Sequence, residues 1–187
     1  MLIKPISMVI SIVYTPLLLA FLGDEKYGLW ATLLSVINWI NYFDVGIGNG
    51  LRNLLSKEIA EDEKEEAQKS VSTAYTIISA IAFVVFVALL ISVFALDWKT
   101  IFSTAIDMQW PLLISFAFIC INFILALSNT LLYALQKSER VSIRACLVQI
   151  INLVGVLLLG RLIDGSLVAM AVLFGMSTLV VYLYKIS

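Results

Sequence analysis

The stretch from Tyr27 to Arg52 combines an apolar run with polar side chains that are unusual inside a membrane-spanning segment. Projected as a helix at about 100° per residue, it gathers its amides, its charges and a glycine on one face. The residues of this face are Asn38, Asn41, Asp44, Gly48, Asn49 and Arg52. Because unpaired polar groups in hydrocarbon cost several kcal/mol, this face is predicted to line a wet cavity or to pack on other helices.

The composition is that of a polytopic membrane protein. Of 187 residues, 61% are hydrophobic and 13% are charged, and the mean hydropathy is +1.02. Soluble domains are roughly 45–50% apolar and about 25% charged. The sequence therefore predicts an all-α fold, a bundle of transmembrane helices that lies in the lipid bilayer.

Six segments are long and apolar enough to cross about 30 Å of hydrocarbon. They form one transmembrane domain over residues 1–187. The predicted spans are about 5–22, 27–50, 71–96, 111–135, 143–160 and 166–184, with a charged helical connector at 51–70.

Lysine and arginine placement predicts the orientation. With six spans, nine of these cations fall on the side of the two termini and three on the other side. The nine are Lys4, Arg52, Lys57, Lys64, Lys69, Lys137, Arg140, Arg144 and Lys185; the three are Lys26, Lys99 and Arg161. The positive-inside rule then places both termini in the cytoplasm.

The fourth predicted span carries Ser115, Asn122, Asn129 and Gln136 at intervals of seven, which keeps them on nearly one face. Asn122 and Asn129 join the cavity set, although amides of this kind also simply hold helices together. Asp44 is costly near an apolar run unless it is paired or wet, which favours a functional role. Arg52 either meets a substrate or anchors its helix end among headgroups.

Several function classes lack their signatures. The sequence has no histidine and no GxSxG, HExxH or P-loop motif. Its two cysteines, Cys120 and Cys146, each lie in an apolar run without a second ligand type nearby. We therefore expect no enzyme activity, no catalytic residue, no metal and no cofactor. The absence of a basic patch also argues against nucleic acid as a partner.

Two motifs in the first part of the chain carry a resemblance to a family. These are LGDEKYGLW at 22–30 and FDVGIGNGLRN at 43–53, followed by a charged connector and a Ser/Thr-rich span start. Together they resemble bacterial polysaccharide biosynthesis transporters. These are the O-antigen, or lipid-linked oligosaccharide, flippases of the multidrug/oligosaccharidyl-lipid/polysaccharide exporter superfamily.

The resemblance implies a role in making cell-surface polysaccharide such as lipopolysaccharide. Members of that superfamily have two six-helix lobes around a central cavity, so this chain resembles the N-terminal lobe. The implied substrate is an undecaprenyl-diphosphate-linked glycan, flipped across the bacterial cytoplasmic (inner) membrane of the cell envelope. The implied partner is a second six-helix lobe, in cis or in trans. A fragment, a truncated reading frame and one half of a two-chain assembly all agree with the sequence.

Two alternatives remain open on the residues alone. A multidrug-extrusion transporter of the same superfamily would favour buried carboxylates in its cavity, whereas here Asp44 has Arg52 two turns away. A membrane scaffold without transport would pair off its polar faces and leave no cavity. For the flippase, we expect the face with Asn38 to border a cleft shared with the first and fourth spans.

Overall fold

The computed structural model describes residues 3–42 and 45–184, and the regular elements within these ranges are all helices. Their bounds are α1 (Ile3–Leu22), α2 (Asp24–Tyr42), α3 (Val45–Ala60), α4 (Lys64–Ala95), α5 (Trp98–Phe102), α6 (Gln109–Ala134), α7 (Ser138–Leu162) and α8 (Leu167–Leu183). The predicted all-α class is thereby confirmed.

The helices have the length and surface of membrane spans. Within the described ranges, α1, α4, α6 and α7 are long and apolar enough to cross a bilayer, and α8 is a shorter apolar helix. Large apolar side chains face outward, among them Phe83 (68% exposed) and Phe94 (71%) on α4 and Met8 (68%) on α1. Such a surface is stable in lipid and unstable in water. The chain is a multi-pass membrane protein that associates with the lipid bilayer.

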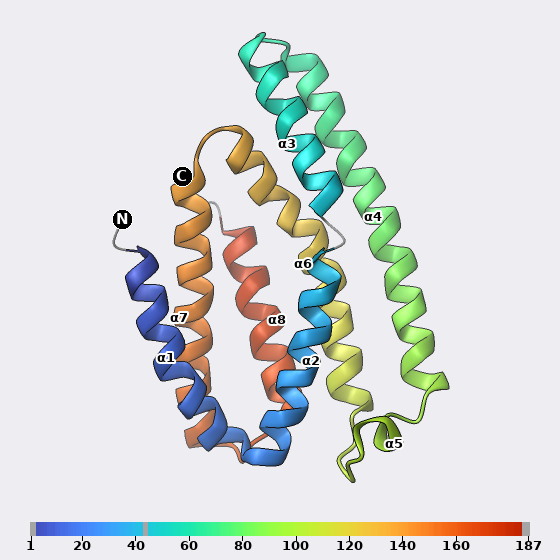
Figure 1. The fold of residues 1–187 in the computed structure, drawn as a ribbon, viewed down its shortest axis with the longest axis vertical. Coiled ribbons are helices and arrows are strands. Elements are labelled where there is room, and N and C mark those ends of the chain that lie inside the picture. Colours follow the sequence, from blue (N-terminus) through green and yellow to red (C-terminus); the bar gives the residue numbers. More distant parts are fainter. Residues whose placement is uncertain (1–2, 43–44, 185–187) are drawn as a thin grey trace.

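Helix α6 lies at the centre of the bundle. It packs against α2, α3, α4, α7 and α8, while α1 packs against α7 and α2 (Figure 1). One buried apolar cluster joins α1, α2, α6 and α8 around Trp30 and Met170, with Val93 of α4 and Val156 of α7. A second cluster joins α3, α4 and α6 around Leu55, Ile78 and Leu127. The bundle thus has two cores, one on each side of α6.

The helix bounds differ from the predicted spans around the second one. We expected one helix over about 27–50, but α2 ends at Tyr42 and α3 begins at Val45. Figure 1 shows α3 displaced from α2 and running beside α4. Gly46, Gly48 and Gly50 all lie inside α3, although glycine lowers helix propensity. A projection on a single helix therefore does not relate Asn38 to Arg52.

The predicted connector is mostly helical. Helix α3 continues to Ala60 and α4 begins at Lys64, so the two form a helical hairpin that projects beyond the neighbouring helices (Figure 1). Asp62 turns the chain with φ of 57°. Inside the hairpin Glu58 is 7% exposed, and Ser70 Oγ donates to its Oε1 at 2.8 Å. A carboxylate held inside the hairpin joins its two helices.

Candidate functional site

A row of polar side chains runs along the inner face of α6. Ser115 is buried, and Asn122 and Asn129 follow it at intervals of seven, half-buried. Among the described residues, Ser115 Oγ and Asn122 Oδ1 are buried without a hydrogen-bond partner. An unsatisfied buried acceptor or donor costs about 1–3 kcal/mol. At these two positions the row therefore has hydrogen-bonding capacity that no described helix uses.

A cavity of about 130 Å³ lies beside this row, between α2, α6 and α8. Its polar lining residues are Asn38, Ser115, Asn122, Thr178 and Tyr182. Asn38 comes from α2, so the structure brings together two of the predicted cavity residues, Asn38 and Asn122, that lie 84 positions apart in the chain. Thr178 Oγ1 donates to the backbone oxygen of Phe174 at 3.3 Å and keeps its lone pairs as acceptors.

The wall of this cavity corrects one expectation. We predicted that the face with Asn38 borders a cleft shared with the first and fourth spans. The fourth predicted span, α6, does line the cavity, but its third wall is α8 and not α1. Helix α1 packs on α7 and α2, where it lines a separate cavity with α2, α7 and α8.

An arginine is joined to the end of the polar row. Arg144, near the start of α7, donates from Nη1 to Ser128 Oγ at 3.0 Å and to Asn129 Oδ1 at 3.1 Å. Asn129 Nδ2 in turn donates to the hydroxyl of Tyr182 at 3.0 Å, and Tyr182 also lines the small cavity. The guanidinium lies 5.9 Å from the Tyr182 ring centroid. Tyr182 therefore links the cavity to the arginine.

The charge of Arg144 has neutral partners. No described carboxylate forms an ion pair with it, and its Nε is buried without a hydrogen-bond partner. Arg144 as a whole is half-buried. A guanidinium in such a place is stabilised by an anion, and its planar fork matches phosphate oxygens.

Arg52 reaches the same end of α6 from α3. Its guanidinium lies 5.2 Å from the ring centroid of Tyr133, within the range of a cation–π interaction. Tyr133 follows Asn129 by four residues, so the two share a face of α6 about 6 Å apart along its axis. Arg52 is exposed, whereas Arg144 is half-buried. Two arginines from different helices thus converge on the last turns of α6.

The remaining predicted site residues are Asn41, Asp44, Gly48 and Asn49. Gly48 is buried on α3 and Asn49 is exposed. The side chain of Asn41 and the whole of Asp44 lie outside the described residues, so the relation expected between Asp44 and Arg52 stays a prediction. Arg144 and Tyr182 were missed as site residues, because Arg144 falls in a basic loop and Tyr182 in an aliphatic run. The one usable signal was an arginine that directly precedes an apolar segment.

The site offers hydrogen-bonding groups and positive charge rather than a reactive centre. Within the described residues no group of three or more histidine, cysteine, aspartate or glutamate side chains is placed to hold a metal ion. The side chains that meet at α6 are amides, hydroxyls and guanidinium groups. They suit the binding of an anion that is attached to a polar, uncharged group.

Comparison with known proteins gives this site a context. The family model described as "Polysaccharide biosynthesis protein" matches residues 1–187. The chain is similar to a protein of Salmonella typhimurium strain LT2 named "Putative O-antigen transporter", at 31% identity over 67 residues. The matched segment is 36% of this chain and 16% of that relative, so it spans a small part of the relative's length. No solved structure matches the chain.

Proposed function

Because this chain belongs to the polysaccharide biosynthesis protein family, we propose that it is one lobe of a flippase for a lipid-linked oligosaccharide. The glycan would be carried on undecaprenyl diphosphate and moved from the inner to the outer leaflet of the bacterial cytoplasmic membrane. The expected product is cell-surface polysaccharide, in line with the transporter name of the Salmonella relative.

One observation carries this proposal: the charge of Arg144, which no described carboxylate neutralises, is connected through Asn129 and Tyr182 to a cavity whose polar lining groups are amides and hydroxyls. Arg52, with help from Lys57 one to two turns later on α3, supplies further positive charge at the same end of α6. Two phosphates of a carrier lipid would meet these arginines, and the first sugars would meet the amides. Arg144 and Asn129 act together in this proposal, and Arg52 acts from the exposed side.

The orientation belongs to the same proposal. With both termini in the cytoplasm, the end of α6 that carries the arginines faces the cytoplasm, where the lipid-linked glycan is loaded. Figure 1 places the start of α1, the end of α8 and the α3–α4 hairpin toward this same end of the bundle. The distribution of nine cations against three supports that orientation.

Two other functions fit the contacts less well. A multidrug exporter would place buried carboxylates in its cavity. The buried carboxylate of the described part, Glu58, instead lies inside the α3–α4 hairpin and accepts from Ser70. A scaffold without transport would pair its polar faces, whereas Ser115 and Asn122 keep unpaired buried atoms beside a cavity.

We further propose that the chain works with a second six-helix lobe, in cis or in trans. One lobe supplies one wall of an alternating-access cavity, and access alternates when two lobes move against each other. The cavity between α2, α6 and α8 would then be half of a larger translocation path. The chain alone would bind substrate without moving it.

Reconstitution tests binding and movement together. The chain is placed in proteoliposomes as a demonstrated monomer, with a fluorescent undecaprenyl-diphosphate-linked trisaccharide in the inner leaflet. We expect the lipid to bind, measured by energy transfer from the protein, and to stay inaccessible to a lectin added outside. Absence of binding would refute the flippase assignment. Translocation by the monomer would refute the need for a second lobe.

A further inference from the structure

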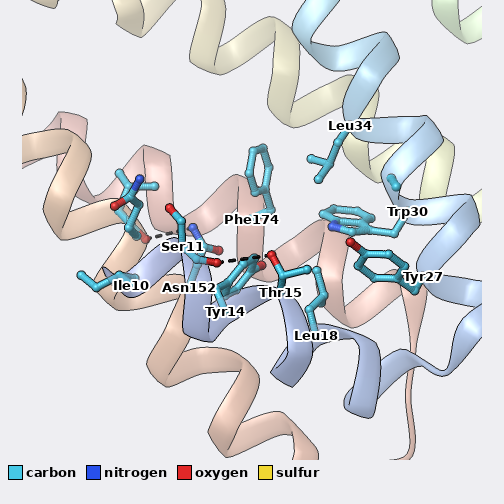
Figure 2. Close-up of a pocket in the computed structure, with 13 residues that line it drawn as sticks. Ile10, Ser11, Tyr14, Thr15, Leu18, Tyr27, Trp30, Leu34, Asn152 and Phe174 are labelled. Atoms are coloured by element: carbon cyan, nitrogen blue, oxygen red, sulfur yellow. Dashed lines mark hydrogen bonds between the residues drawn. The ribbon is translucent and has the colours of Figure 1, made fainter. Parts of the chain in front are cut away.

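A second, larger cavity, bordered like the first by Phe174, lies between α1, α2, α7 and α8, with a volume of about 380 Å³ (Figure 2). Four aromatic residues line it: Tyr14, Tyr27, Trp30 and Phe174. Trp30 meets the edge of Phe174 at a centroid distance of 5.9 Å and an interplanar angle of 78°. This T-shaped contact favours the observed orientation of the indole ring.

Two buried polar atoms at this cavity have no partner in the described part of the chain. They are Nε1 of Trp30, a residue only 1% exposed, and Oε1 of Gln149. Both residues line the cavity, Trp30 from α2 and Gln149 from α7. The indole nitrogen is a donor and the amide oxygen is an acceptor. A ligand that both accepts and donates a hydrogen bond would satisfy both.

Three other polar side chains at this cavity, Ser11, Thr15 and Asn152, form hydrogen bonds within the chain. Ser11 and Thr15 donate to the backbone oxygens of Ser7 and Ser11 in α1, at 3.0 and 3.3 Å. Asn152 donates from Nδ2 to Val148 O at 2.9 Å, and its Oδ1 accepts from Ser177 Oγ at 3.3 Å. These bonds fix the side chains in place. Trp30 and Gln149 carry the fully buried polar atoms that lack a described partner at this cavity, and the tyrosines Tyr14 and Tyr27 add hydroxyl groups to its lining.

Charge separates this cavity from the arginine site. Among its lining residues, all of which the structure describes, none is lysine, arginine, aspartate or glutamate. An ionic ligand would lose its hydration without a countercharge. An acyl chain would leave the two buried polar atoms unpaired, each at a cost of about 1–3 kcal/mol. Water alone would satisfy polar atoms but would face mostly aromatic and aliphatic walls.

We propose that this cavity binds one neutral pyranose ring. The C–H faces of the sugar would pack on the aromatic rings, while one hydroxyl accepts from Trp30 Nε1 and another donates to Gln149 Oε1. The inference rests on the proposed function only in taking this ring to be a sugar of the carried glycan. Phe174 lines this cavity and the smaller one beside Asn122, so the two cavities are separated by one side chain.

The test uses the whole chain in nanodiscs, labelled with ¹⁵N at tryptophan, and methyl β-D-glucopyranoside as the probe. The indole N–H signal of Trp30, identified as the one missing from Trp30→Phe, reports the hydrogen bond. Saturation transfer to the probe reports affinity for every variant, including Trp30→Phe. Sodium glucuronate is the charged comparison and cyclohexanol is the apolar ring of similar size.

We expect the glucoside to shift the Trp30 signal saturably. Trp30→Phe and Gln149→Leu should each weaken binding roughly 3- to 10-fold, the loss of one hydrogen bond. The matched variants Trp110→Phe, at a residue 62% exposed, and Gln109→Leu, also exposed, should bind as the wild type does. Glucuronate and cyclohexanol should bind more weakly than the glucoside.

Three results would overturn the inference: no shift of the Trp30 signal with the glucoside, equal binding of cyclohexanol, or unchanged affinity in Gln149→Leu. Because Gln149→Leu leaves the Trp30–Phe174 contact intact, a folding defect of Trp30→Phe does not remove the test. Glucoside binding without diphosphate-lipid binding would refute the proposed function alone. Diphosphate-lipid binding without glucoside binding would refute this inference alone.

Discussion

At the end of the bundle that holds the α1–α2 turn and the α7–α8 loop, polar side chains bond to partners within the chain. Lys26 Nζ donates to Gly165 O at 2.6 Å, and Thr104 Oγ1 donates to Glu25 Oε1 at 2.7 Å. At the opposite end, Arg144 bonds to neutral oxygens and Arg52 lies over an aromatic ring. Lys26 and Glu25 at the first end thus bond to other segments of the chain, whereas Arg144 and Arg52 at the second end contact neutral groups.

This difference separates residues that act on stability from residues that act on binding. Groups satisfied inside the chain should affect unfolding when they are changed. Substitution of charged groups that contact neutral partners should weaken the binding of an anionic ligand and leave the free energy of unfolding nearly unchanged. The predictions below compare the two ends on that basis, and they run from the largest expected effect on stability to the smallest effect of any kind.

The largest effect is expected at Gly165. A Cβ at this position would overlap the backbone oxygen of Phe21, and backbone cannot move aside as a flexible side chain does. Gly165→Ala should therefore lower the free energy of unfolding by about 1–3 kcal/mol, as overpacking does. Denaturant titration in detergent micelles measures it. Gly28→Ala is the control: nothing lies within 4 Å of its added Cβ, and unchanged stability at Gly165 would contradict the close approach.

Loss of the Lys26 hydrogen bond should come next. Lys26→Met keeps the length of the side chain and removes the donor to Gly165 O, which should cost about 1–2 kcal/mol for a charge-assisted bond. The same titration compares it with Lys137→Met, an exposed lysine at the opposite end. If the two variants are equally stable, the hydrogen bond from Lys26 to Gly165 does not stabilise the fold.

Arg52 should affect binding rather than stability. Arg52→Lys keeps the charge but loses the planar fork, and Arg52→Gln loses both. We expect undecaprenyl diphosphate to bind a few-fold more weakly to Arg52→Lys and weaker still to Arg52→Gln, since a hydrogen bond to a charged group is worth about 1.5–3 kcal/mol when fully formed. If Arg52→Lys binds the lipid normally and Arg52→Gln only lowers the amount of protein inserted in the membrane, Arg52 is a membrane anchor and not a phosphate ligand.

The smallest effect is expected at Asp97, in the loop before α5. The hydroxyl of Thr100 donates to Oδ2 at 2.7 Å and lowers the pKa of this carboxyl. The hydrogen bond from the backbone N–H of Lys99 lowers the same pKa further. Thr100→Ala should raise the pKa of Asp97 toward the ordinary value of about 3.9, as followed by its ¹³Cγ signal.

The sign of the pH dependence follows from the direction of that shift. A lowered pKa in the folded chain stabilises it above the unfolded pKa, and this contribution is lost as pH falls through the folded value. Thr100→Ala should therefore remove it, whereas Thr76→Ala, whose hydroxyl bonds to its own helix backbone, should leave Asp97 unchanged. An unshifted Asp97 signal in Thr100→Ala would show that the hydroxyl does not set the pKa.

Much of the fold was predictable from composition and spacing. Long apolar segments can satisfy their backbone in lipid only as helices, and the predicted all-α membrane class is confirmed. The family, predicted from two motifs at 22–30 and 43–53, is confirmed by the match over residues 1–187. The interval of seven on α6 likewise predicts a common face for Ser115, Asn122 and Asn129. The structure places Asn38 beside Asn122, and the function of that pair stays a proposal.

Two features depended on contacts between segments that are distant in the sequence. Arg144 bonds to Asn129, and Asn129 to Tyr182, only because α6, α7 and α8 pack side by side. Spacing along one helix carries no information about such partners. The packing of α3 on α4, apart from α2 (Figure 1), is likewise a contact between segments that the apolar pattern does not contain.

The role of Arg144 as an anion site is tested most directly by the dissociation constant of undecaprenyl diphosphate. It is measured in phosphatidylcholine nanodiscs for the wild-type chain, Arg144→Lys, Arg144→Gln and Arg161→Gln. Arg161 is exposed and lies at the end of the bundle that holds the α7–α8 loop. We predict binding roughly 10- to 100-fold weaker in Arg144→Gln, an intermediate loss in Arg144→Lys, and no change in Arg161→Gln. Equal dissociation constants for the wild type and Arg144→Gln would contradict the assignment of this end of α6 to a phosphate.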